Sequence, residues 1–146
     1  NLKFIDLFCG IGGFRIAFER AKCKCVFSSD WDQYSQITYE ANFDEKPYGD
    51  INAINIADIP KHDILCAGFP SQPFSQCGQH KGFDDERGTL FFNIMKFVKF
   101  HKPKIIILEN VQGLLNHDGG KTFDRIKKDI ETENYTITYK VIKCRC

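Results

Sequence analysis

Short apolar runs that alternate with helix-like stretches are the feature of this sequence that most constrains its fold. The apolar runs have the length and composition of buried strands, and they lie at residues 3–8 (KFIDLF), 25–29 (CVFSS), 64–67 (ILCA) and 105–108 (IIIL). The stretches with helical periodicity between them lie at residues 14–21, 33–42 and 89–101. A strand–helix–strand order of this kind predicts a parallel sheet with helices on both faces. The predicted fold class is therefore α/β.

Three further segments extend this pattern. A short third strand is predicted from Tyr48 to Ile51, a helix from Gly119 to Glu131 and an alternating strand from Tyr135 to Lys143. A chain of 146 residues is long enough to bury a core, so residues 1–146 are expected to form part of one domain.

Composition argues against several classes of protein. No apolar run approaches the length of about 20 residues that spans a membrane, so no membrane partner is expected. The seven cysteines are odd in number and several lie in apolar segments, which favours free thiols in the cytoplasm over disulfides. The pairs Cys23/Cys25 and Cys144/Cys146 are too closely spaced for an ordinary zinc site, so no metal is expected. A net charge of +1 does not by itself indicate a nucleic-acid ligand.

The segment from Asp63 to Ser75 (DILCAGFPSQPFS) is the strongest candidate for chemistry. Its apolar strand is followed at once by Gly68, Pro70 and Pro73, which cannot continue a strand and set a rigid turn. The turn presents Ser71 just past the carboxyl end of a strand, where ligands collect in open α/β sheets. A rigid loop without chemistry is the alternative.

A glycine-rich turn follows the first predicted strand. Gly10, Gly12 and Gly13 lie between that strand and the helix that begins near Phe14. Such a turn lets a ligand approach the backbone closely and directs helix amides at it. A dinucleotide-binding loop requires a further glycine near Arg15, which is not one. The turn therefore favours a nucleotide-type ligand without a pyrophosphate, and an NAD-dependent dehydrogenase is the least favoured function.

Acidic and aromatic residues follow the next two predicted strands. Asp30 lies 20 residues after Gly10, at the position where a carboxylate accepts hydrogen bonds from ribose hydroxyls. Trp31 offers a flat face to a purine, and Asp50 ends the third strand at the same edge of the sheet. The alternatives are that Asp30 caps the next helix and that Trp31 belongs to the core. Together these residues suit an adenosine-bearing ligand, for which S-adenosylmethionine is the natural candidate.

Two later segments bear on the same edge of the sheet. The strand at residues 105–108 delivers Glu109 there, as a candidate to donate a proton to a bound base. A cap of the following turn is the alternative role for this side chain. The polar segment from Gln76 to Gly88 suits either an active-site lid or an ordinary surface loop.

Four of these segments resemble the motifs of the DNA (cytosine-5)-methyltransferases. They are DLFCGIGGF at residues 6–14, SSDWD at 28–32, GFPSQPFS at 68–75 and ENV at 109–111. Their order and spacing match that family over residues 2–143. The resemblance implies a Rossmann-like sheet that binds S-adenosylmethionine. It also implies a double-stranded DNA substrate whose cytosine is flipped out of the duplex into the active site.

The resemblance also implies roles for individual residues. Ser71 stands at the position of the nucleophile, Glu109 would bind the cytosine ring at N3, and Asn110 and Pro70 would shape the pocket around the base. The residues that would hold the cofactor are Phe8, Gly10, Gly12, Gly13, Asp30, Trp31, Asp50, Ile51 and Leu90. An enzyme of this kind is expected in the bacterial cytoplasm, as part of a restriction–modification system.

Two departures from the family pattern bear on activity. The family attacks cytosine with a cysteine thiolate, whereas this chain has Ser71, and a serine hydroxyl needs an adjacent base to react. The family's later motifs and target-recognition segment do not occur in these 146 residues. The sheet is therefore expected to be incomplete at its C-terminal side, with residues 105–108 as an open edge. The chain is expected to be inactive alone, and either a second chain supplies the other half or the protein is truncated.

Two alternative functions stay open on the sequence alone. Ser71 and the open sheet edge favour a non-catalytic partner subunit or a pseudoenzyme. The same family pattern also fits a cytosine-5 methyltransferase that acts on RNA.

Overall fold

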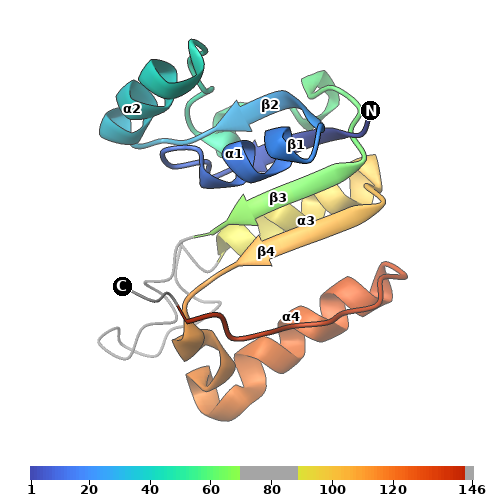
Figure 1. Cartoon of the computed structure of the whole chain (residues 1–146). Helices are drawn as coiled ribbons and strands as arrows, with labels where there is room; N and C mark the ends of the chain where they lie inside the picture. Colours follow the sequence, from blue (N-terminus) through green and yellow to red (C-terminus); the bar gives the residue numbers. More distant parts are fainter. Residues whose placement is uncertain (70–88, 144–146) are drawn as a thin grey trace. The chain divides into compact units, whose positions relative to one another are not determined.

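The computed structural model describes residues 1–69 and 89–143, and these fall into two compact units (Figure 1). The first unit contains residues 1–69 and 96–109, and the second contains residues 89–95 and 110–143. The first unit holds a parallel sheet of four strands in the order β2-β1-β3-β4. The strands are β1 (Lys3–Leu7), β2 (Lys24–Ser29), β3 (Ile64–Gly68) and β4 (Ile105–Glu109). The predicted parallel α/β fold is confirmed.

An apolar cluster forms the core between the sheet and α1 (Gly13–Arg20). The cluster contains Phe4, Ile64 and Cys66 from the strands and Phe14 and Phe18 from the helix. In Figure 1, α1 lies in front of the sheet, and the C-terminal half of α3 (Thr89–His101) lies behind it. Both faces of the sheet are therefore covered, as its runs of consecutive apolar residues predict.

The second helix of the first unit, α2 (Gln33–Phe43), ends one residue beyond its predicted end. The Asp32 carboxylate accepts a hydrogen bond from the backbone N–H of Ser35 at 2.8 Å, so Asp32 is the N-cap of the helix. At the other end, Asp44 adopts a left-handed conformation with φ 53°, which terminates the helix.

The prediction of a third strand at residues 48–51 is wrong. A single bridge pairs Tyr48 with Ser29 of β2, and a 3₁₀ turn, η1 (Ile51–Ala53), follows. The Asp50 carboxylate accepts a hydrogen bond from a backbone N–H of that turn at 2.8 Å. Because this side chain gives the backbone a local hydrogen-bond partner, the chain forms a turn there and the pairing with β2 does not continue beyond the bridge.

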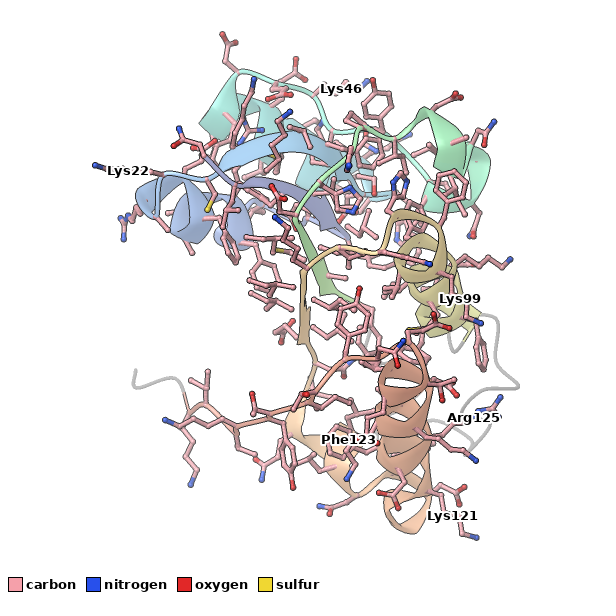
Figure 2. All side chains as sticks on the ribbon, turned by 90° about the vertical axis from the view of Figure 1, so that its right-hand side faces the viewer. Lys22, Lys46, Lys99, Lys121, Phe123 and Arg125 are labelled. Carbon is pink, nitrogen blue, oxygen red and sulfur yellow. The ribbon has the colours of Figure 1, made fainter. Side chains whose placement is uncertain are left out.

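The longest described helix of the second unit is α4 (Lys121–Thr132), which follows the short turns η5 (Gln112–Leu115) and η6 (His117–Gly120). It begins two residues later than predicted because Gly119 (φ 64°) and Gly120 (φ 90°) have left-handed conformations in the turn before it. The ring of Phe123, labelled on α4 in Figure 2, meets the ring of Tyr139 edge-on, with centroids 4.9 Å apart.

The prediction of a strand from Tyr135 to Lys143 is also wrong. This segment pairs with no strand in the part of the chain that the structure describes. Alternating apolar residues suit a strand, but the backbone N–H and C=O groups of a strand need a neighbouring strand. The segment instead contacts α4 through side chains, and Lys127 Nζ lies 5.9 Å from the centroid of the Tyr139 ring.

The strand β4 lies at the edge of the sheet, as predicted. Within residues 1–69 and 89–143, no strand pairs with its outer side, and Ile105 is 46% exposed. This strand is therefore less buried than its run of aliphatic residues predicts. None of the helices in these two ranges is long and apolar enough to cross a membrane.

Candidate functional site

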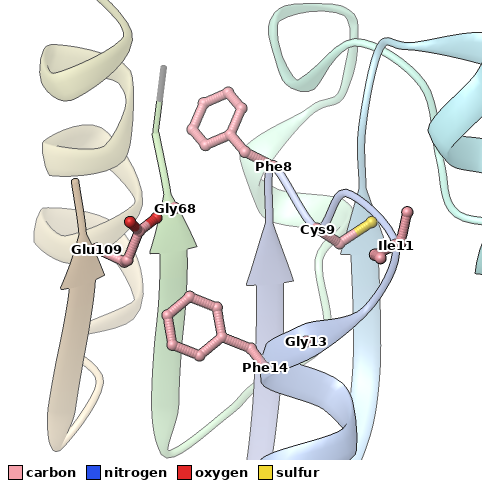
Figure 3. A pocket seen from close by; sticks show the side chains of 7 residues that line it. All are labelled: Phe8, Cys9, Ile11, Gly13, Phe14, Gly68 and Glu109. Carbon is pink, nitrogen blue, oxygen red and sulfur yellow. The ribbon is translucent and has the colours of Figure 1, made fainter. Parts of the chain in front are cut away.

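The carboxyl ends of the strands border an open pocket of about 470 Å³ in the first unit (Figure 3). The loop after β1, the start of α1 and the ends of β3 and β4 supply its lining. The lining residues are Phe8, Cys9, Ile11, Gly13, Phe14, Gly68 and Glu109. The pocket thus lies at the edge of the sheet where the sequence predicts a ligand.

The loop after β1 has a tight, left-handed backbone. Phe8 (φ 55°), Gly10 (φ 55°) and Gly12 (φ 98°) all adopt left-handed conformations. Such a conformation strains a residue that carries a side chain, and residues strained in this way concentrate at functional sites. The Cys9 N–H donates to the Ser29 carbonyl at 2.9 Å, which ties the loop to the end of β2. The loop therefore has a defined shape of its own.

Asp30 connects this loop to the start of α2. Its Oδ2 accepts the Gly10 N–H and its Oδ1 accepts the Asp32 N–H, each at 2.8 Å. The alternative that Asp30 caps α2 is wrong, since Asp32 fills that position. An ionised carboxylate offers about four acceptor sites, so Asp30 retains capacity for the hydroxyls of a ribose.

Trp31 stands beside the loop as an exposed aromatic residue. The residue is 44% exposed, and its ring meets the Phe8 ring edge-on, with centroids 5.7 Å apart. The alternative that Trp31 belongs to the core is therefore wrong. An exposed indole that is held by a second aromatic ring provides a surface on which a purine can stack.

The three glycines of the loop have different roles. A Cβ added to Gly10 or Gly13 would meet no described atom within 4 Å, so both leave space in which a ligand can approach the backbone. A Cβ on Gly12 would overlap the ring of Phe43 in α2. Gly12 is therefore needed for packing within the protein, and its predicted role at the cofactor stays a prediction.

Asp50 and Ile51 follow the bridge at Tyr48. The Asp30 N–H donates to the Tyr48 carbonyl at 2.9 Å, so this segment passes the end of β2. Asp50 is exposed and caps η1, whereas Ile51 is buried at 4% exposure. Neither residue lines the pocket, so the predicted role of both at the cofactor stays a prediction.

Glu109 reaches the pocket from the end of β4. It is aligned with Gly68 in the parallel register of β3 and β4. A Cβ on Gly68 would lie only 3.0 Å from Glu109 Oε2, so the absence of a side chain there makes room for the glutamate. Figure 3 shows Glu109 at the end of its strand, beside Gly68. The predicted edge position of Glu109 is confirmed.

Other predicted residues lie elsewhere. Ser71, Pro70 and the segment from Gln76 to Gly88 are outside the described residues. Leu90 and Asn110 belong to the second unit, where Leu90 is buried in α3 and the Asn110 Oδ1 accepts the N–H of Val111 at 2.8 Å.

Four lining residues were not named individually as site residues from the sequence, although Cys9 and Ile11 lie in the loop at residues 9–13 that was expected to line the crevice. The four residues are Cys9, Ile11, Phe14 and Gly68. Each lies inside one of the motifs described above, so its position next to a predicted site residue could have indicated that it lines the pocket. By contrast, no local signal marks Phe43, because its contact with the loop depends on how α2 packs.

Asp6 is a buried acid two residues before the loop. It is fully buried, and neither carboxylate oxygen has a hydrogen-bond partner among the described residues. Burial raises the pKa of Asp6 to about 7, an effect that the Arg15 charge opposes and the Asp30 charge reinforces. The folded protein therefore favours the neutral form of this side chain.

Asp6→Asn is expected to stabilise the protein increasingly as the pH rises. An aspartate in the unfolded chain ionises near pH 3.8, whereas the folded pKa is about 7. Between these values the unfolded state loses its proton first, so the native protein loses stability at up to about 1.4 kcal/mol per pH unit. Asparagine carries no charge, so the advantage of the variant should grow from pH 4 to pH 7 and then level off. Urea unfolding at a series of pH values measures this.

Asp63→Asn is the matched control for that experiment. The N–H of Lys3 donates to the Asp63 carboxylate at 2.9 Å and lowers its pKa. That stabilising effect is present at neutral pH and is lost as the pH falls through the folded pKa. Asp63→Asn should therefore lower the free energy of unfolding at neutral pH. A gain in stability for Asp6→Asn that does not change with pH would contradict the raised pKa of Asp6.

Comparison with known proteins identifies relatives along almost the whole chain. The sequence profile of the C-5 cytosine-specific DNA methylases matches residues 2–146. Type II methyltransferase M.HaeII of Haemophilus aegyptius is 57% identical over 140 residues, which are 96% of this chain and 44% of that protein. M.NgoBI of Neisseria gonorrhoeae is 55% identical with the same coverage of 96% and 44%. M.HhaI of Haemophilus parahaemolyticus is 51% identical over 97% of this chain and 43% of that protein. The chain thus spans less than half the length of these curated relatives.

Two solved structures share the fold. The S. pombe Dnmt2 methyltransferase has a TM-score of 0.68 and 24% identity, and the match covers 88% of this chain and 42% of that chain. A DNMT2 mutant of Spodoptera frugiperda has a TM-score of 0.65 and 23% identity, with coverage of 88% and 41%. These identities support the fold alone, whereas the profile match and the relatives at 51–57% identity establish the family. The chain belongs to the family of C-5 cytosine-specific DNA methylases.

Proposed function

We propose that residues 1–146 are the N-terminal part of the catalytic domain of a DNA cytosine-5 methyltransferase that uses S-adenosylmethionine. One observation carries this proposal, the 2.8 Å hydrogen bond from the Gly10 N–H to the Asp30 carboxylate. It joins the glycine-rich loop and the acidic end of the second strand into one site, next to the pocket. A family motif that is assembled in this way is more informative than either segment alone.

The residues of this site suit an adenosine-bearing cofactor. Asp30 can accept ribose hydroxyls, the exposed Trp31 ring can stack on adenine, and Gly10 and Gly13 leave open space at the loop. The other proposed cofactor residues, from the family resemblance, are Phe8, Gly12, Asp50, Ile51 and Leu90. S-adenosylmethionine would supply the methyl group when bound.

At the cytosine, Glu109 is the residue we propose to hold and protonate the base. Asn110 and Pro70 are proposed to shape the base pocket, and Ser71 stands where the nucleophile is needed. Cys9 and Cys66 do not replace the missing thiol, since burial raises the pKa of both thiols and leaves little thiolate at neutral pH. With serine at position 71, the chain is therefore proposed to bind its ligands without forming the covalent bond to cytosine.

The proposed substrate is double-stranded DNA with a cytosine flipped out of the duplex. Lys22, Lys46 and Lys99 of the first unit point outward from separate elements in Figure 2, so these three do not form one basic surface. This chain matches 44% of the length of M.HaeII, and we propose that much of the phosphate binding comes from residues that correspond to the rest of that protein. The proposed setting is a restriction–modification system in the bacterial cytoplasm.

A non-catalytic partner subunit is the second candidate function, and Ser71 favours it. Such a subunit would form a stable complex with a second polypeptide and would remain inactive after Ser71→Cys. The first candidate predicts instead that Ser71→Cys restores methyl transfer once the rest of the catalytic domain is supplied, because it attributes the inactivity to the serine.

Titration with S-adenosylhomocysteine, followed by the fluorescence of Trp31, tests the cofactor proposal. Trp31 is the only tryptophan, and its exposed ring beside Phe8 should change its emission when a purine binds. The change should saturate, and NAD should produce none. Asp30→Ala keeps the fluorophore and should weaken the response, because it removes the proposed ribose acceptor. A response to NAD alone, or to neither compound, would contradict the proposal.

A further inference from the structure

We infer that Arg15 is a positioning residue for the glycine-rich loop, because it holds the end of α2 against that loop. The inference rests on the proposed function in one respect: it assumes that the loop binds the cofactor. Arg15 lies in α1 directly after the loop and is only 8% exposed, although it carries a charge. A buried guanidinium needs several partners, and these identify its role.

The guanidinium of Arg15 has three polar partners. Its Nε lies 2.7 Å from Glu19 Oε1 within α1, and a second nitrogen lies 2.8 Å from Glu45 Oε2, just past the end of α2. A third nitrogen donates to the hydroxyl of Tyr39 in α2 at 3.0 Å. Because its planar fork binds groups on both helices at once, Arg15 fixes the position of α2 relative to α1.

The same guanidinium lies against the aromatic residues of α2. Its central carbon is 4.8 Å from the centroid of the Phe43 ring and 5.6 Å from that of Tyr39. The Phe43 ring occupies the space into which a side chain on Gly12 would project. Arg15 therefore acts on the loop through Phe43: its guanidinium packs on the Phe43 ring, and that ring packs against Gly12.

The neighbouring residue of α2 holds the loop in a second way. Asn42 Nδ2 donates to the carbonyl of Ile11 at 3.2 Å. Consecutive residues of α2 thus contact the consecutive loop residues Ile11 and Gly12. Ile11 lines the pocket on one side of Gly12, and Gly13 lines it on the other. A movement of α2 would therefore change the shape of the pocket, and a fixed α2 preorganises it.

Arg15→Met tests this inference in the full 146-residue chain. The substitution keeps an apolar side chain of similar length and removes the guanidinium. Two quantities are measured, the Kd for S-adenosylhomocysteine by calorimetry and the amide hydrogen exchange of residues 11–13. Arg20→Met removes an exposed arginine from the same helix and is the matched control. Ile64→Val controls for stability, because it weakens the core at the start of β3, at the other end of that strand from the pocket.

Arg15→Met is expected to raise the Kd about tenfold, which corresponds to a loop that holds its binding shape for about a tenth of the time. Exchange at residues 11–13 should accelerate in the absence of ligand. Both controls should leave the Kd and this exchange unchanged, even though Ile64→Val lowers the melting temperature. Asn42→Ala should shift both quantities in the same direction by a smaller factor, and it supplies the test if Arg15→Met fails to fold.

Two results would overturn the inference. One is unchanged exchange of the loop in Arg15→Met and in Asn42→Ala, and the other is an equal loss of affinity in Ile64→Val. Failure of the unaltered chain to bind S-adenosylhomocysteine would instead contradict the proposed function. In that case, faster loop exchange in Arg15→Met would still support the positioning role, so the two failures are distinguishable.

Discussion

Gly12→Ala is expected to lower the free energy of unfolding by about 2–5 kcal/mol, the sum of left-handed backbone strain and overpacking. Gly12 has φ 98°, a conformation that residues with a side chain rarely adopt. The added methyl group would also overlap the ring of Phe43, which Arg15 holds in place. Urea unfolding, followed by the fluorescence of Trp31, measures the change.

Gly13→Ala is the matched control for that substitution. Gly13 is the first residue of α1, its φ is not left-handed, and no described atom lies within 4 Å of an added Cβ. The free energy of unfolding should stay the same or rise by up to about 1 kcal/mol, because alanine favours helix over glycine. The methyl group would occupy space proposed for the cofactor, so binding of S-adenosylhomocysteine should weaken although the fold is retained. Equal destabilisation by the two variants would contradict the packing role of Gly12.

Ser71→Cys is expected to raise the rate of methyl transfer to DNA by several orders of magnitude once the chain is completed by the remaining length of M.HhaI. Loss of the nucleophile alone lowers kcat by about 10⁶-fold in a serine protease, which sets the scale of the effect. A thiol of ordinary pKa, about 8.5, is a few per cent thiolate at neutral pH and is intrinsically nucleophilic, whereas a serine hydroxyl is not. Transfer of a labelled methyl group to cytosine in a DNA duplex measures the rate, and an RNA substrate in parallel tests the RNA alternative.

Ser75→Cys controls for the mere presence of a new thiol in the same segment. It should not restore transfer, and neither substitution should change the affinity for S-adenosylhomocysteine, since both serines lie outside the proposed cofactor residues. Equal rates for the completed chain with and without Ser71→Cys would contradict the assignment of position 71. Transfer to RNA alone would exclude DNA as the substrate.

The amino-acid sequence by itself determined the fold class and the edge of the sheet at which the candidate pocket lies. Buried parallel strands consist of short apolar runs, and the helices between them have a different periodicity, so both are visible locally. Parallel strands also place their carboxyl ends at one edge of the sheet, which is why Gly10 and Asp30 could be assigned to one site before any contact was known. Their 2.8 Å hydrogen bond joins residues only 20 positions apart.

Only the tertiary structure decided how each of these residues is used. Gly12 accommodates the ring of Phe43, and Arg15 contacts both Glu19 of α1 and Tyr39 of α2, because these contacts depend on the packing of two helices. The segment from Tyr135 to Lys143 has the alternation of a strand but forms none, since a strand also needs a neighbour to accept and donate its hydrogen bonds. Local patterns specify which elements a chain can form, whereas long-range packing and backbone pairing select the contacts that those elements make.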